Sequence, residues 1–173
     1  MNDTPRAARP EWVAALRDAG IDFDACHEKI RQIIEYWFSI HPETGLPGRQ
    51  HFDPIDVPRH LRNLRLLDVV DGDPPRFRTR LMGTYLVEFF GQEQTGLCFD
   101  EIYPNFEKTK AFRHMTETVA TKRPNWYRGK PILKHEKDFA TIERVFLPFA
   151  QDGNRVDLIL SCILFGDEDG NFC

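Results

Sequence analysis

Residues 158–165, with the sequence LILSCILF, constrain the fold more than any other segment, because they are apolar at nearly every position. A strand with one face in water alternates polar and apolar side chains, whereas a strand covered on both faces is apolar throughout. The segment therefore predicts a central strand in a sheet that is covered on both faces. Asp152-Gly153, just before it, is a typical hairpin turn, so the preceding strand lies beside this one.

The order of the other predicted elements defines the rest of the sheet. Strands are expected at residues 63–70 and 76–82, joined by the turn sequence DGDP, and again at 125–134, 140–149 and 155–165. A short helix from residue 83 to 90 and a longer one from 104 to about 121 separate the two groups. Because a two-stranded ribbon is unstable alone, all five strands are expected to form one sheet.

A strongly amphipathic helix is predicted at residues 26–40, before the sheet. Its apolar stripe has helical spacing, and its opposite face carries charged and amide side chains. An exposed stripe of this size would promote aggregation, so it must be covered. Two covers are open at this point: the sheet, or a second copy of the helix in a homodimer. The candidate dimer-interface residues are Ile30, Ile33, Ile34 and Trp37.

Length and composition limit the remaining choices. The chain has 173 residues, 41% of them hydrophobic and 14 of them Phe, which is enough for one domain with a substantial core. We expect an N-terminal tail and helical extension at 1–52, a domain at 53–166 and an acidic tail at 167–173. A net charge of -4 argues against a nucleic-acid partner, because general polyanion binding needs a basic field.

Further classes of protein are disfavoured by what the sequence lacks. It contains no apolar run of the ~20 residues that span a bilayer and no apolar leader core, so we expect a cytoplasmic protein without a membrane partner. Its four cysteines are scattered without a CxxC pair, which predicts reduced thiols and no metal site. The usual nucleophile, phosphate-loop and zinc-protease motifs are absent as well, so catalysis is not expected.

Three short motifs, in this order and spacing, resemble those of the PAS superfamily. They are DPIDVP at residues 53–58, FRTRLMGT at 77–84, and the Thr95-Gly96 pair that leads to FDEI at 99–102. More specifically, they are similar to a bacterial family of small, often stand-alone PAS proteins, over roughly residues 53–165. The resemblance implies an α+β fold: a five-stranded antiparallel sheet with helices on one face, here with an N-terminal amphipathic helical extension.

The resemblance also implies a function. PAS domains close their helices over the sheet to form a small cavity, which is their usual ligand site, so we expect a non-catalytic sensory or regulatory protein that binds a small ligand. With no room for an output domain, signalling would pass through protein partners or a homodimer. The candidate cavity residues are Tyr85, Phe89, Phe90, Phe106, Phe112, Met115, Trp126, Phe146 and Cys162.

Two other functions stay open. One is a ligand-free dimeric interaction scaffold with a filled core. The other is a small, cone-shaped α+β enzyme, which would need acid and base groups converging in its pocket. The candidate acid and base residues for that alternative are Asp56, His60, Tyr85 and His114, and we expect them not to converge in one pocket.

The ligand itself is unknown, although two cofactors common in PAS domains are not expected. A flavin photosensor needs the motif G-x-N-C-R-F-L-Q, whereas residues 96–101 have the sequence GLCFDE, in which Cys98 fits a small core residue. Haem would need an axial histidine on the longer helix, but His114 lies beside the apolar stripe rather than in it. Residues 104–137 carry nine Lys or Arg against three Glu, which fits either an anion-binding patch or an ordinary solvated face.

Overall fold

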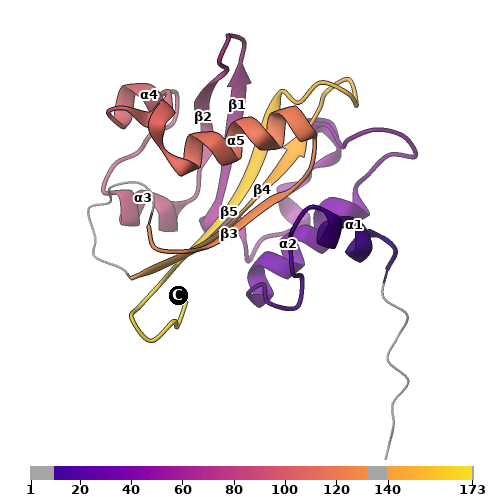
Figure 1. Cartoon of the computed structure of the whole chain (residues 1–173), viewed down its shortest axis with the longest axis horizontal. Coiled ribbons are helices and arrows are strands. Elements are labelled where there is room, and N and C mark those ends of the chain that lie inside the picture. The colour runs from indigo at the N-terminus through magenta and orange to yellow at the C-terminus, as the bar shows by residue number, and fades with distance from the viewer. Residues whose placement is uncertain (1–9, 132–139, 173) are drawn as a thin grey trace, which may run out of the picture.

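The computed structural model describes residues 10–131 and 140–172 and contains one antiparallel sheet (Figure 1). Its strands are β1 (Leu64–Val70), β2 (Arg76–Met82), β3 (Asn125–Gly129), β4 (Thr141–Phe149) and β5 (Leu158–Gly166). They lie in the order β2-β1-β5-β4-β3. The predicted five-stranded antiparallel sheet is therefore confirmed, with β5 at its centre.

Two groups of helices lie on opposite sides of this sheet (Figure 1). One group is α1 (Trp12–Asp18) and α2 (Glu28–Ser39), and the other is α3 (Thr84–Phe90), α4 (Phe99–Ile102) and α5 (Lys110–Thr121). The helix predicted from residue 104 begins later, at Lys110. Asn105 has a left-handed φ of 56°, which breaks the helical path, and the Thr109 hydroxyl caps α5 by accepting from the Phe112 N–H.

The central strand β5 is apolar at nearly every position because it lies between two cores. Alternate side chains of β5, such as Leu160 and Cys162, pack in the core under α2. The side chains between them, such as Ile159 and Phe165, pack in the cores under α3, α4 and α5. Because successive side chains of a strand point to opposite faces, a strand between two cores must be apolar on both. Ser161 is the one polar side chain in this strand, and it is fully buried.

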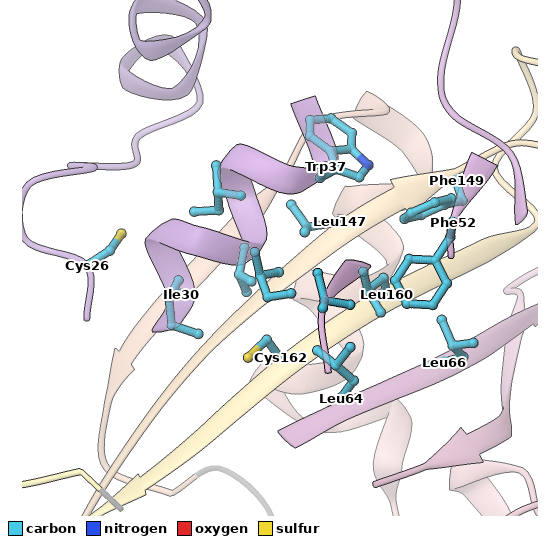
Figure 2. Packing of buried hydrophobic residues seen from close by; sticks show 14 of the residues in the cluster. Cys26, Ile30, Trp37, Phe52, Leu64, Leu66, Leu147, Phe149, Leu160 and Cys162 are labelled. Carbon is cyan, nitrogen blue, oxygen red and sulfur yellow. The ribbon is translucent and has the colours of Figure 1, made fainter. Parts of the chain in front are cut away.

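The apolar stripe of α2 lies flat on the sheet of its own chain (Figure 2). Ile30, Ile33, Ile34 and Trp37 are all 0–2% exposed. The Trp37 indole also donates a hydrogen bond to the Pro148 carbonyl on β4, at 3.1 Å. Of the two predicted covers the sheet is correct, and the assignment of these four residues to a dimer interface is wrong, because one chain already buries them completely.

Glu143 on β4 fastens the start of α2 to the sheet. Its fully buried carboxylate accepts from the His27 backbone N–H at 2.8 Å, the Trp126 indole at 3.0 Å and the Arg128 Nε at 2.9 Å. Such a carboxylate is compensated both by charge and by hydrogen bonds. The N-terminal helix therefore shares a core with residues 64–164, and a domain boundary at residue 53 stays a prediction.

Replacing Ile33 with Ala tests this packing. The side chain is fully buried, so its loss is expected to lower the free energy of unfolding by about 2–5 kcal/mol. The matched control is Ile55→Ala, because Ile55 is 82% exposed and its loss should change stability by less than about 0.5 kcal/mol. Urea unfolding measures both; equal effects of the two substitutions would contradict the packing of α2 on the sheet.

Candidate functional site

A cavity of about 40 Å³ lies between the sheet and the α3–α5 helices. Its walls are mostly apolar, and they include Leu67, Phe90, Phe99, Met115, Phe146 and Ile163. Two arginines, a serine and Tyr127 interrupt this apolar lining. A volume of this size has room for a few water molecules or one small ligand, and is well below that of an ordinary drug-sized pocket.

The predicted cavity residues divide into three sets. Phe90, Met115 and Phe146 line the cavity as expected. The other aromatic candidates on α3 and around α5 pack in the adjoining cores without lining it: Tyr85, Phe89, Phe106 and Phe112.

Trp126 and Cys162 were placed on the wrong face. Both lie in the core under α2, where the Trp126 indole donates to Glu143 and Cys162 packs below Ile30 (Figure 2). The reason is strand alternation: Tyr127 and Ser161, their sequence neighbours, take the cavity face instead. Trp126 and Tyr127 therefore point to opposite faces of the sheet.

Arg65 on β1 enters the cavity wall and is only 1% exposed. Its guanidinium donates to the Thr79 hydroxyl through Nε at 3.1 Å and Nη2 at 2.6 Å, and to the Gln94 side-chain oxygen. It also lies 4.2 Å from the centroid of the Phe99 ring. Burial lowers the pKa of Arg65 to about 10, so the cation persists at pH 7 with neutral acceptors around it.

Arg144 on β4 enters the same cavity from the other side and is 4% exposed. Its Nη1 donates to the Asn125 side-chain oxygen at 3.1 Å, and its Nη2 contacts Nδ1 of His114 on α5. The guanidinium stacks on the Phe146 ring, 3.8 Å from its centroid. Burial lowers the pKa of Arg144 to about 9, so this group too stays charged at pH 7.

Ser161 lies between the two arginines in the sheet. It is paired with Arg65 on β1 and with Phe146 on β4, while Arg144 is paired with Ile163. Its hydroxyl oxygen is buried and has no hydrogen-bond partner among the described residues. An unpartnered buried hydroxyl costs about 1–3 kcal/mol, so this group is ready to donate to anything that enters the cavity.

Arg65, Arg144 and Ser161 are not among the residues predicted for the cavity, although the sequence contains a signal for each. Each is a polar residue on a strand face that is otherwise apolar. Arg65 shares its face with Leu67, two residues further along β1, and Arg144 shares its face with Phe146, two residues further along β4. Period-two alternation assigns them to the inner face. Nothing in the sequence, however, shows that both guanidinium groups enter one cavity.

The residues considered for an enzyme do not converge. Asp56 accepts from the Tyr36 hydroxyl on the α2 side, at 3.1 Å, and the buried His60 ring has neither nitrogen hydrogen-bonded among the described residues. On the other side of the sheet, Tyr85 packs against Phe89 and Phe165, away from the cavity wall. His114 contacts Arg144.

Within residues 10–131 and 140–172, no three His, Cys, Asp or Glu side chains are grouped as metal ligands would be.

A five-stranded antiparallel sheet with short helices closed over one face is the fold that the resemblance to PAS domains predicted. A comparison with family models agrees: residues 25–164 match the model of a PAS domain family. The chain belongs to this family, whose domains are generally sensory and non-catalytic. The match begins before α2, so it includes the helix that covers the second face.

Two other comparisons found nothing. No curated protein and no solved structure matches the chain. In the part of the chain that the structure describes, no helix has the length and apolar character needed to cross a membrane.

The contact between His114 and Arg144 predicts a pH-dependent contribution to stability. Burial, then the charges of Arg144, Arg113 and Lys110, lower the pKa of His114 from 6.5 to about 4. As the pH falls from 6.5 towards 4, His114 becomes protonated in the unfolded chain but stays neutral in the folded chain. The folded state is therefore destabilised relative to the unfolded state. Because His114 is partly exposed, the loss is expected to be about 2 kcal/mol.

The His114→Gln variant keeps an acceptor near Arg144 but cannot titrate. Urea unfolding at pH 7 and pH 4.5 should show a smaller loss of stability for the variant than for the parent chain. NMR titration of the His114 ring should give a pKa well below 6.5. Equal losses of unfolding free energy in the two proteins would show that folding does not lower the pKa of the His114 ring.

Proposed function

We propose that this PAS protein is a sensory or regulatory protein without catalytic activity, which binds a small ligand in the cavity under α5 and signals through protein contacts. The observation that carries the proposal is the cavity lining itself. Two buried guanidinium groups and an unpartnered serine hydroxyl enter a space that is otherwise apolar. Apolar walls with a few convergent polar groups are the usual character of a small-molecule site.

The same polar groups suggest how occupancy would be transmitted. Arg144 reaches the cavity from β4 and also contacts His114 on α5. A ligand that draws the Arg144 guanidinium towards itself would weaken this contact and change the position of α5 on the sheet. Because only differential binding to two states can shift an equilibrium, the contact between β4 and α5 is the element that the ligand would bias.

The alternative is a ligand-free interaction scaffold. Two observations favour it: the cavity is only about 40 Å³, and both guanidinium groups stack on aromatic rings, those of Phe99 and Phe146. In that case the arginines are core residues, and signalling depends on surface contacts alone. The stripe of α2 is not available for such contacts, because it is buried within the chain.

Filling the cavity distinguishes the two functions. Ala111 on α5 is buried and lines the cavity, so Ala111→Leu should occupy it; Ala120→Leu, on the exposed face of the same helix, is the matched control. Thermal unfolding is measured with a library of small metabolites. A compound at a hundred times its Kd stabilises the folded chain by about 2.7 kcal/mol, which raises Tm by several degrees.

We expect at least one compound to raise the Tm of the parent chain and of Ala120→Leu but not of Ala111→Leu. Native mass spectrometry should detect the same compound as added mass on the 20.2 kDa chain. If no compound stabilises the parent chain, and the purified protein carries no added mass, the ligand-binding function is wrong and the scaffold is favoured.

A further inference from the structure

The charges around the cavity are unbalanced. Arg65 and Arg144 are both at least 96% buried, and neither forms an ion pair among the described residues. Moving a charge of this kind out of water has a cost of several kcal/mol, which proteins usually offset with an opposite charge. Here the partners are neutral: the hydroxyls of Thr79 and Tyr103, the side-chain oxygens of Gln94 and Asn125, a backbone carbonyl, an imidazole nitrogen and aromatic rings.

The carboxylates closest in the sheet are engaged elsewhere. Asp68 pairs with Arg78 at 3.0 Å and with Arg80 at 2.7 Å. Glu143 precedes Arg144 in the sequence, but it points to the α2 face and pairs with Arg128.

Glu93 and His114 do not supply the missing charge either. Glu93 accepts from the backbone N–H and the hydroxyl of Thr95, at 2.9 and 2.7 Å, and attracts Arg65 only from a distance. His114 has a pKa lowered to about 4 and is therefore neutral at pH 7. The cavity thus holds two positive charges with no described anion beside them.

We propose that the cavity binds a small organic carboxylate whose anionic group lies between Arg65 and Arg144 and accepts the Ser161 hydroxyl. This inference rests on the proposed function, that the cavity takes a ligand, and adds the ligand's chemical class. Arg65 and Arg144 belong to strands two positions apart, about 10 Å across the sheet, and both side chains line the same space. A guanidinium is planar and has five N–H donors, which suits it to carboxylate recognition.

The walls and the volume define the rest of the ligand. Apart from the polar groups named above, the lining consists of aliphatic and aromatic side chains, so the part of the ligand beyond the carboxylate must be apolar. A volume of about 40 Å³ restricts it to a few carbon atoms. The expected class is a short-chain monocarboxylic acid, for which sodium propionate is a suitable probe.

Isothermal titration calorimetry and thermal unfolding with sodium propionate test the proposal. Propionamide is the neutral isostere, inorganic phosphate is the competing anion, and sodium chloride matches the ionic strength. We expect propionate to bind and raise Tm, and propionamide, phosphate and chloride to have little effect. The Arg65→Met and Arg144→Met variants should each weaken propionate binding more than tenfold, because each removes one charged partner.

Two further variants test the role of the serine hydroxyl and control for the loss of a positive charge. Ser161→Ala removes one hydroxyl without disturbing either arginine, and it should weaken propionate binding about tenfold because one hydrogen bond to a charged group is lost. Arg113→Met removes the same charge from the exposed face of α5 and should leave binding unchanged. Circular dichroism of each variant shows whether it folds, and Ser161→Ala remains informative if either arginine variant does not.

Each remaining outcome has a definite meaning. Equal binding of propionate and propionamide would overturn the carboxylate inference while leaving the ligand-binding function in place. Binding of phosphate alone would overturn it in favour of an inorganic oxoanion. Propionate binding that survives in Ser161→Ala, Arg65→Met and Arg144→Met would place the acid outside the cavity and overturn the inference. If neither propionate nor any compound of the metabolite library binds, the proposed function fails together with the inference.

Discussion

Burial of both faces of β5 is the constraint on which the rest of the structure depends. The strand is apolar at nearly every position, so neither face can be left to water, and the chain must supply a cover for each. The α3–α5 group covers one face and α2 covers the other. Since α2 is fastened by Glu143 and by the Trp37 indole, the N-terminal helix is a structural layer of the sheet.

The two covers are chemically different, and the difference locates the functional site. The α2 face is filled mainly by leucine, isoleucine, valine and aromatic side chains, and its fully buried Glu143 carboxylate is paired with Arg128. The α5 face holds two buried cations beside a cavity and a hydroxyl without a partner. A buried cation without an opposite charge beside it is costly to fold, and a bound anion would offset that cost. The proposed ligand site and its preference for a carboxylate both follow from this contrast.

Much of the fold could be predicted from the sequence because it depends on local periodicity. The stripe of Ile30, Ile33, Ile34 and Trp37 predicted α2, and the apolar run at 158–165 predicted a central strand. What covers the stripe was not predictable, because amphipathicity shows that a face must be buried and not which surface buries it. The start of the longer helix was wrong for a local reason: Asn105 adopts a left-handed conformation that residue type alone does not require.

The site was harder to predict than the fold. Aromatic content and the family resemblance led to Phe90, Met115 and Phe146, but also to Trp126 and Cys162 on the opposite face. Neighbouring residues of a strand point to opposite faces of the sheet. An error of one residue therefore moves a side chain from the cavity wall to the other face. The two guanidinium groups come from β1 and β4, with β5 between them, and only the sheet order brings them to one cavity.

A crystal structure of the protein grown with sodium propionate, at a resolution that shows ordered water, tests the central claim most directly. That claim is that Arg65 and Arg144 enclose a site for a small anion under α5. The predicted result is both guanidinium groups in the cavity without a carboxylate from the chain, with density for the acid within hydrogen-bond distance of the Ser161 hydroxyl. Guanidinium groups paired with a carboxylate of the chain, or turned out to solvent around an empty cavity, would contradict it.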